Sequence, residues 1–245
     1  MMRILIVHNK YLCPGGEDEV VKSEQNMLER FGNTVLLYER SNQEIKSYGW
    51  MKKVRFFLKD IYSSQAVFQD IQSVLKKFKP DIIHVHNTFS VIGNSIYRAG
   101  QEAGIPVVQT LHNYRFLCPI GVFYRGGIIC EDCTTKGKKS AVINRCWKNS
   151  YLLSGLLVNT INNAYEKINF SDIVSQFIVP TKFSQEKYVK NGWDPKKLSI
   201  KSNFLSTDLQ ALPKRGDYAL FVGSLQSYKG VELLVTAFRK LGRGF

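Results

Sequence analysis

The sequence predicts an α/β fold in which a parallel β-sheet carries helices on both faces, the Rossmann-like doubly wound arrangement. Two observations support this prediction. Short segments rich in β-branched residues recur along the chain, and most are separated by segments with helical periodicity. These short segments are apolar throughout, which is typical of strands that are buried on both faces.

The predicted elements alternate between strand and helix. The first strand, 3–8, leads through a loop that contains Pro14, Gly15 and Gly16 into a helix whose first residues, 17–19, are acidic. An acidic start suits the positive end of the helix dipole. One face of this helix is apolar and carries Val20, Val21, Met27, Leu28 and Phe31. Further strands are expected at 34–38, 82–86, 107–110, 173–179 and 218–222, with helices at 67–78 and 91–103.

The composition is that of a globular protein, with 44% hydrophobic and 22% charged residues in a chain of 245. No apolar export segment is found at the N-terminus, and no run approaches the roughly 18 apolar residues of a membrane span. We therefore expect an intracellular protein whose five cysteines are thiols or metal ligands. The formal net charge of +14 predicts an anionic partner, such as phosphate, nucleic acid or a lipid surface. Nucleic acid is not expected, because the basic residues are spread out and no helix-turn-helix or RNA-binding pattern occurs.

Ligands of such sheets bind at the carboxyl ends of the strands. Four loops follow predicted strands there, at 9–16, 87–90, 112–115 and 180–184. In the first loop, Gly15 and Gly16 lack side chains, so backbone N–H groups and the helix N-terminus can approach an anion. A plain tight turn is the alternative. The pattern is not GxGxxG, so a dinucleotide cofactor is not expected.

Histidines lie at the ends of two predicted strands, in IIHVHN (82–87) and QTLHNYR (109–115). Alternation along a strand puts His84 and His86 on the same face. His112 follows its strand and faces the ligand side, where it can hydrogen-bond a hydroxyl group or act as an acid or base. We expect a satisfied core histidine at His84 and a site residue at His112, because polar residues follow His112 in a loop.

Four cysteines fall in one loop-rich segment with the pattern C-x11-C-x2-C-x12-C: Cys118, Cys130, Cys133 and Cys146. Four thiolates can hold a zinc ion in tetrahedral geometry, and such a site is structural because no open position remains. Free or redox-active thiols are the alternative. We expect the remaining cysteine, Cys13, to be a buried thiol.

The segment 48–62, YGWMKKVRFFLKDIY, is predicted to be a basic amphipathic helix. Its apolar face is expected to carry Trp50, Met51, Val54, Phe57, Leu58 and Ile61, with Lys52, Lys53, Arg55 and Lys59 on the other faces and Phe56 exposed among them. A helix of this kind can lie on an anionic membrane. The alternative is that its apolar face packs on the core while its basic face is solvated.

Taken in order, these segments resemble glycosyltransferase family 4, whose retaining enzymes have two facing Rossmann-like domains known as the GT-B fold. The resemblance covers nearly the whole chain. It is carried by ILIVHNKYLCPGGEDEVV, PDIIHVHN, VVQTLHNYRFLCP, FIVPTKFSQEKYVKNG, SIKSNFLSTD and YALFVGSLQSYKGVELLVTAF. The cysteine segment resembles an insertion found in members that are concerned with surface polysaccharide synthesis.

The resemblance implies transfer of a sugar from a nucleotide-sugar to a glycan or lipid-linked acceptor, with retained anomeric configuration and no catalytic metal. It places His112 beside the transferred sugar near the reacting centre. Gly15 and Gly16 are expected to approach the donor phosphates, and Lys229 to neutralise the diphosphate. On the acceptor side we expect Asn87, Asn113 and Arg115. The implied location is cytoplasmic, peripherally on the inner face of the plasma membrane.

The same resemblance divides the chain into an acceptor-side domain at 1–201, with the cysteine insertion at about 113–150, a linker at 202–216 and the start of a donor-binding domain at 217–245. Ser224 stands where the family commonly has an arginine that contacts phosphate. The family's paired glutamates, which contact the donor, would lie beyond residue 245. We therefore expect a truncated or split enzyme that works with a second polypeptide, and a tail that packs on the first domain or is poorly ordered.

Two other functions stay open. A noncatalytic remnant that binds a glycan or a membrane precursor would fail transfer assays both alone and with cell extract. Nucleic-acid binding through the positive charge would give DNA retention that falls steeply with salt.

Overall fold

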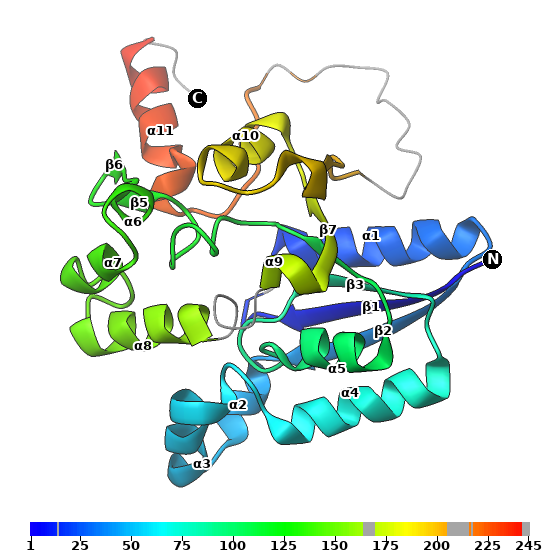
Figure 1. Ribbon diagram of the computed structural model, residues 1–245. Helices are drawn as coiled ribbons and strands as arrows, with labels where there is room; N and C mark the ends of the chain where they lie inside the picture. The colour runs from blue at the N-terminus through cyan, green and yellow to red at the C-terminus, as the bar shows by residue number, and fades with distance from the viewer. Residues whose placement is uncertain (14, 164–169, 205–215, 217, 242–245) are drawn as a thin grey trace.

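The computed structural model describes residues 1–13, 15–163, 170–204, 216 and 218–241 (Figure 1). Its main body is a six-stranded sheet with the order β2-β1-β3-β4-β7-β8, in which all neighbouring strands are parallel. The strands are β1 (Arg3–Lys10), β2 (Thr34–Ser41), β3 (Ile82–Asn87), β4 (Val107–Thr110), β7 (Val174–Val179) and β8 (Leu198–Ile200). The predicted doubly wound parallel sheet is confirmed. The short strands β5 (Tyr124–Arg125) and β6 (Ile128–Ile129) form a separate antiparallel hairpin.

Helices cover both faces of the sheet, with α1 above the strands and α4 and α5 below them in Figure 1. The longer helices are α1 (Gly16–Arg30), α4 (Gln65–Phe78), α5 (Ser95–Ala103), α8 (Tyr151–Ile161), α10 (Lys182–Lys190) and α11 (Val231–Lys240). The shorter ones are α2 (Gln43–Ser47), α3 (Trp50–Arg55), η1 (Phe56–Asp60), α6 (Asp132–Thr135), α7 (Lys139–Ile143), α9 (Phe170–Ile173), η3 (Pro195–Lys197) and η4 (Ser227–Lys229).

Helix α4 shows how the sequence builds these elements. The Ser64 side chain caps the helix by accepting a hydrogen bond from the N–H of Val67. Apolar residues at helical spacing then bury one face of α4 in the core: Val67, Phe68, Ile71 and Leu75. Each of these side chains stabilises the fold by roughly 1.5–3 kcal/mol. The helix ends at Lys79, which adopts a left-handed conformation with φ of 48°.

The chain order of the strands creates a switch point between β1 and β3. From β1 the chain runs outward to β2 and then returns to β3 on the other side of β1. The loops that follow β1 and β3 therefore leave in opposite directions and open a crevice at the carboxyl ends of these strands. The ordinary place for a ligand in this fold is thus the edge where His8, Asn9 and Asn87 end their strands.

The predicted strand at 218–222 is wrong. Residues 218–222 pair with no strand of the sheet, and Tyr218, Leu220 and Val222 are each at least 70% exposed. An isolated apolar segment has no partner for its backbone groups, so β-propensity alone does not form a strand. The helix expected after this segment does form, as α11.

The predicted apolar face of the helix at 48–62 is wrong in part. Trp50, Met51 and Leu58 are exposed, and Phe56, which was expected on the surface, is only 3% exposed, whereas Ile61 is buried as expected. Phe56 begins the π-helical turn η1, in which the N–H of Ile61 bonds to the carbonyl of Phe56 at 2.8 Å. A π turn adds a residue to the helical repeat, so the side chains that follow Phe56 depart from the α-helical periodicity on which the prediction rests.

Two other expectations concern parts of the chain that the structure leaves undescribed. Most of the linker at 202–216 lies outside the described residues, as do residues 242–245. Among the helices that are described, none has both the length and the apolar character needed to cross a bilayer.

Candidate active site at the strand ends

Three of the four strand-end loops meet through direct hydrogen bonds. Asn87, which ends β3, donates from Nδ2 to the carbonyl of Asn9 at 2.6 Å, and its Oδ1 accepts from the hydroxyl of Tyr11 at 3.5 Å. Arg115, in the loop after β4, donates from Nη2 to the same Tyr11 hydroxyl at 3.3 Å. The loops after β1, β3 and β4 therefore enclose one polar site.

The fourth loop joins from the other side. The hydroxyls of Tyr114 and Ser184 are 3.1 Å apart, and Tyr188 donates to the carbonyl of Asn113 at 2.8 Å. These bonds fix the backbone that carries His112 against helix α10. All four strand-end loops are thus joined by hydrogen bonds.

The glycine loop is placed at the N-terminus of α1, as the sequence predicts, but its first N–H is occupied. Gly15 donates to Asp18 Oδ2 at 2.6 Å, and Asp18 Oδ1 lies 2.9 Å from Nε2 of His8. Burial opposes ionisation of Asp18, but these two bonds dominate and hold its pKa below the usual range. Gly15 and Gly16 are exposed, and no atom lies near where their Cβ would be. An approaching phosphate would find Gly16 open and would face the Asp18 carboxylate.

Glu17 is a site residue that the sequence analysis missed. Its Oε1 accepts from Asn87 Nδ2 at 3.2 Å. Burial raises the pKa of Glu17 to about 7, with the neighbouring Asp18 charge adding to the effect and Arg115 opposing it. A carboxyl group that titrates near neutral pH at a strand-end crevice is suited to exchange a proton with a ligand.

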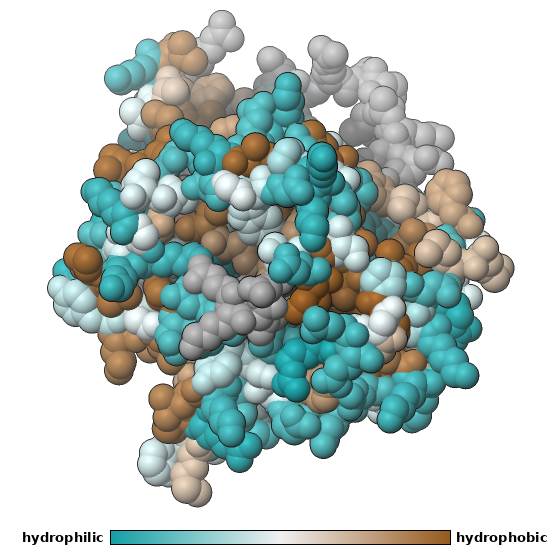
Figure 2. Space-filling view, viewed as in Figure 1, coloured by the Kyte–Doolittle hydropathy of each residue, from teal (hydrophilic) through white to brown (hydrophobic). Residues whose placement is uncertain are grey.

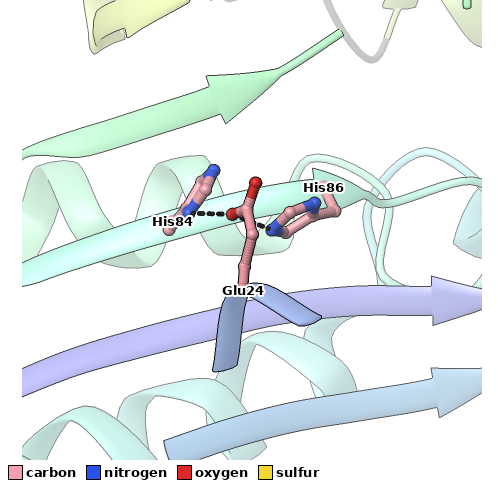
Figure 3. Close-up of side chains that lie close together, drawn as sticks. All are labelled: Glu24, His84 and His86. Carbon is pink, nitrogen blue, oxygen red and sulfur yellow. Dashed lines mark ion pairs between the residues drawn. The ribbon is translucent and has the colours of Figure 1, made fainter. Parts of the chain in front are cut away.

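A row of buried polar groups lies directly behind the site. His84 and His86 project from β3 toward α1, where Glu24 reaches between them (Figure 3). One carboxylate oxygen of Glu24, Oε2, is 3.3 Å from both His84 Nδ1 and His86 Nε2. The Lys201 ammonium hydrogen-bonds the other oxygen. At the far end of the row, His86 Nδ1 lies 2.9 Å from His112 Nε2.

The histidines of this row are neutral at pH 7. Burial, reinforced by neighbouring ionisable groups, lowers the pKa of His84, His86 and His112 to about 3 in each case. The expectation for His84 is confirmed, since it is a core residue whose Nε2 lies 2.8 Å from the Thr110 hydroxyl. His112 meets the site as an uncharged imidazole, able to donate one hydrogen bond and accept another.

Glu24 could have been found from the sequence. It lies three residues after Val21 and four before Leu28, both of which pack on the inner face of α1. A carboxylate in the middle of an apolar stripe at helical spacing predicts a buried, paired group, because an unpaired buried charge is too costly. The histidines at matching positions on β3 are the partners that this signal requires.

The three expected acceptor-side residues lie at the site, and all three form hydrogen bonds within the protein. The Oδ1 of Asn113 accepts from the N–H of Arg115 at 3.0 Å, and both polar atoms of the Asn87 side chain are engaged as described above. Arg115 stacks over Phe89 at 4.5 Å and donates from Nη1 to the carbonyl of Pro119 at 3.2 Å. Because a guanidinium has five N–H donors, Arg115 retains capacity for a ligand.

Lys229 is placed apart from this group. It lies in η4, with its ammonium 5.6 Å from the ring of its neighbour Tyr228, which in turn lies 6.4 Å from Tyr124 of the hairpin. A cavity of about 1040 Å³ also lies away from the strand ends, lined in part by Cys133, Lys136 and Trp193. None of the four histidines lines it. We place the site at the strand ends, since that is where the polar side chains converge.

The insertion brings its four cysteines near one another as free thiols. A hydrogen bond from Cys133 lowers the pKa of Cys118 to about 6, against burial, and the N–H groups of Phe123, Gly121 and Val122 add to the effect. The hydrogen bond with Cys118 and burial raise the pKa of Cys133, and the charges of Cys118, Cys146 and Cys130 add to the effect.

The expectation for Cys13 is wrong, because it is exposed in the loop after β1. In the described part of the chain, Glu24, His84 and His86 are the one set of three ligand-type groups whose atoms lie within 4.8 Å of one another. The sulfurs of the insertion are therefore grouped less tightly than these atoms.

Comparison with protein families finds a match to the model described as Glycosyltransferase Family 4 over residues 15–209. No curated protein matches the chain. Solved structures that resemble it include UDP-GlcNAc 2-epimerases from Methanocaldococcus jannaschii and from Neisseria meningitidis, the latter bound to UDP-GlcNAc, and MurG of Acinetobacter baumannii.

Their identities to this chain are 12%, 16% and 10%, and their TM-scores are 0.43, 0.42 and 0.40. The matches cover 81%, 82% and 83% of this chain but only 45%, 46% and 46% of the solved structures. The chain thus spans less than half the length of the structures it matches.

Proposed function

Because the chain belongs to glycosyltransferase family 4, we propose that it transfers a sugar from a nucleotide-sugar to a glycan or lipid-linked acceptor, with retention of configuration and no catalytic metal. The observation that carries this proposal is the position of His112. It stands at the carboxyl edge of the parallel sheet, held 2.9 Å from His86, where the loops after four strands converge. This is the edge at which the fold binds ligands.

The proposed roles follow from the chemistry of each group. Departure of a nucleoside diphosphate requires positive charge and N–H groups where negative charge develops. Arg115 supplies a cation at the strand ends, Gly15 and Gly16 supply the helix N-terminus, and Lys229 contributes from the segment before α11. Neutral His112 hydrogen-bonds a hydroxyl of the transferred sugar, while Asn87 and Asn113 hold the acceptor-side loops in place.

Residues of a second domain would complete the donor site. Segment 218–241 exposes apolar side chains, among them Leu225 at 81% and Leu233 at 75%. Further strands and helices of a donor-binding domain, in the same or in a second polypeptide, would cover these side chains. We propose that this domain supplies the contacts to the nucleotide.

The acceptor is proposed to be lipid-linked and used in surface polysaccharide synthesis, with the protein bound peripherally to the inner face of the plasma membrane. In the space-filling view, hydrophobic side chains project beside hydrophilic ones at the lower tip of the molecule, where α3 lies (Figure 2). The exposed apolar residues of this tip are Trp50, Met51, Val54 and Leu58. The basic side chains among them are Lys52, Lys53, Arg55 and Lys59, so the surface suits an anionic membrane.

We also propose that the four cysteines of the insertion hold a structural zinc ion. Thiolates are the form that binds zinc, and three backbone N–H groups already favour the thiolate of Cys118. A divalent ion at this position would favour the thiolate form of the remaining cysteines, as coordination requires. Such an ion would tie the hairpin and α6 to the loop after β4.

Transfer assays test the proposed function. Radiolabelled nucleotide-sugars are supplied to the wild-type chain with membrane extract from cells that lack it, and incorporation into lipid or glycan is compared with that of His112→Asn. We expect incorporation with the wild type and a loss of at least about 100-fold with His112→Asn. Equal incorporation by both proteins would contradict the role of His112.

A noncatalytic role in binding glycans or membrane precursors is the second candidate. It is favoured by the occupied N–H of Gly15, which bonds to Asp18 and is thereby withheld from a donor phosphate. This role predicts binding of acceptor glycans or lipids without incorporation of sugar from any donor, alone or with extract.

A further inference from the structure

A row of polar contacts leads from the half-buried Lys201 through the buried Glu24 and His86 to the candidate site. Lys201 bonds to Oε1 of Glu24, and Oε2 of the same carboxylate faces one nitrogen of His84 and one of His86 at 3.3 Å. The second nitrogen of His86, Nδ1, faces His112 Nε2 at 2.9 Å. Glu24 is 2% exposed, so its carboxylate depends on these partners alone among the described residues.

The charges in this row are already balanced. The Lys201 ammonium neutralises the Glu24 carboxylate, and the histidines are neutral at pH 7 because burial lowers their pKa values. A divalent cation held by Glu24, His84 and His86 would sit close to that ammonium, where like charges repel. We therefore treat this cluster as a row of polar contacts instead of a metal site.

The position of the hydrogen on each histidine then follows from the carboxylate. A neutral imidazole carries one N–H and one lone pair, and an ionised carboxylate repels a lone pair that faces it. His84 Nδ1 and His86 Nε2 each lie 3.3 Å from Glu24 Oε2, although His86 Nε2 is outside hydrogen-bonding geometry, so these two nitrogens carry the hydrogens. His86 Nδ1 is left with a lone pair and accepts from His112 Nε2.

We propose that Glu24 is a positioning residue that fixes the tautomer of His112 through His86. His112 carries its hydrogen on Nε2, bonded to His86, and presents the lone pair of Nδ1 as a hydrogen-bond acceptor. The consequence for catalysis rests on the proposed function, in which this lone pair accepts from a hydroxyl of the transferred sugar. The tautomer itself does not depend on that function.

The wild-type protein provides the first test. Long-range ¹H–¹⁵N correlation spectra of the ¹⁵N-histidine-labelled chain at pH 7 report which nitrogen of each ring is protonated, and the chain has four histidines to assign. We expect protonation at Nδ1 of His84, at Nε2 of His86 and at Nε2 of His112. A His112 that carries its hydrogen on Nδ1 would overturn the proposal, whether or not sugar transfer is observed.

Glu24→Gln provides a sharper test, because it should move the hydrogen of each of these three histidines to the other ring nitrogen. Lys201 requires an acceptor, so the glutamine oxygen turns toward it and the amide NH₂ faces His84 and His86. Both histidines must then accept from the amide, which moves the hydrogen of His86 to Nδ1 and that of His112 to Nδ1. An unchanged His112 tautomer in the folded variant would contradict the proposal.

Two control variants separate this effect from general disturbance. Glu29→Gln changes an exposed carboxylate of the same helix and should leave all four tautomers unchanged. Thr110→Val removes the hydroxyl beside His84 but lies off the path to His112, so His86 and His112 should keep the wild-type tautomers. A His112 tautomer that reverses in Thr110→Val would show that its orientation does not come from Glu24. If Glu24→Gln does not fold, the wild-type and Thr110→Val spectra still decide the proposal.

Where sugar transfer is measurable, Glu24→Gln should lower kcat while KM for the donor stays within about twofold, because the orienting contact matters most at the reacting centre. A loss of transfer with unchanged tautomers would reject the positioning role without bearing on the proposed function. Reversed tautomers in a chain that transfers no sugar would reject the function and leave the positioning role standing.

Discussion

The histidine row and the cysteine insertion are the two places where ligand-type side chains gather, and they are built differently. The residues of the row lie mainly on parallel strands and on the long helix α1. These elements place one ligand atom each of Glu24, His84 and His86 within 4.8 Å of one another. Three of the cysteines, Cys118, Cys130 and Cys146, lie outside helices and strands, and Cys133 lies in a four-residue helix; the four are grouped less tightly.

The difference in charge is as instructive as the difference in scaffold. The row contains its own cation, Lys201, so it is neutral without any ligand. The insertion offers a thiol at Cys118 that favours its ionised form, and part of this effect comes from backbone N–H groups that carry no full charge. The charges of the first cluster are thus balanced within the protein, whereas for the second we propose a metal ion.

The largest expected effect is on the insertion. Cys133→Ser should make the segment at about 113–150 cleavable by protease on the order of tenfold faster at pH 7, because loss of the metal frees loops that have little apolar core of their own. A chelator added to the wild type should have the same effect. Cys13→Ser, which alters an exposed thiol outside the insertion, is the matched control and should cleave like the wild type.

The next largest effect is expected from removal of the Glu24 carboxylate, which contacts Lys201, His84 and His86. Glu24→Ala leaves Lys201 and two imidazole N–H groups without an acceptor and should lower the free energy of unfolding by about 3–5 kcal/mol. Denaturant unfolding monitored by circular dichroism measures this change. Glu29→Ala on the same helix should change the free energy by no more than about 0.5 kcal/mol. Similar small losses for both variants would show that the row contributes little to stability.

The row should also make stability depend on pH. The folded pKa of His84, His86 and His112 is about 3, below the ordinary 6.5, so the unfolded chain binds protons first as the pH falls. Stability is therefore full above about pH 6.5 and is lost as the pH falls toward 3, by up to about 1.4 kcal/mol per pH unit for each histidine. Unfolding curves at pH 7, 6 and 5 measure this slope.

Glu17 changes the stability with pH in the direction opposite to the histidines, so a variant of Glu17 provides a second test of the same pH dependence. Its folded pKa of about 7 lies above the ordinary 4.5, so its contribution to stability is full below pH 4.5 and is lost as the pH rises through 7. Glu17→Gln removes this contribution, and the acid-induced loss of stability should become steeper by on the order of 1 kcal/mol between pH 7 and 5. A shallower pH dependence in Glu17→Gln would contradict these assignments.

The smallest effect on stability is expected at the tip that carries α3. Trp50→Ala combined with Leu58→Ala should reduce sedimentation with anionic liposomes by about tenfold and change the unfolding free energy by about 0.5 kcal/mol or less, because both side chains are exposed. Neutral liposomes serve as the control. Equal partitioning at all lipid compositions would remove the membrane role.

The sequence is a good guide to the sheet and a poorer one to single side chains. Continuous apolar segments predict β1 and β3 within two residues of their ends. A strand that is buried on both faces needs mostly apolar residues along its whole length, so the segment itself marks the strand. The same reasoning fails at 218–222, where β-propensity meets no neighbouring strand. Helical periodicity fails within 48–62, where a π turn begins at Phe56 and shifts the side chains that follow it. Such features depend on tertiary contacts that a local pattern does not contain.

The candidate site divides in the same way. His112 is predictable because it follows a strand at the ligand edge, and the shared face of His84 and His86 follows from alternation. Their link to Glu24 requires two elements about 60 residues apart to be seen together, and the acidic residue in the apolar stripe of α1 is its one local sign. Lys229 is far in the sequence from the residues of the strand ends, so the sequence alone does not show whether it reaches them. Its proposed role depends on where a second domain is placed.

Metal analysis of purified, reduced protein tests the contrast between the two clusters most directly. Wild type and Glu24→Gln are predicted to carry about one equivalent of zinc each, and Cys133→Ser to carry none. Zinc that is lost in Glu24→Gln and kept in Cys133→Ser would place the metal at the histidine row. That result would contradict both the metal-free histidine row behind His112 and the structural zinc proposed for the insertion.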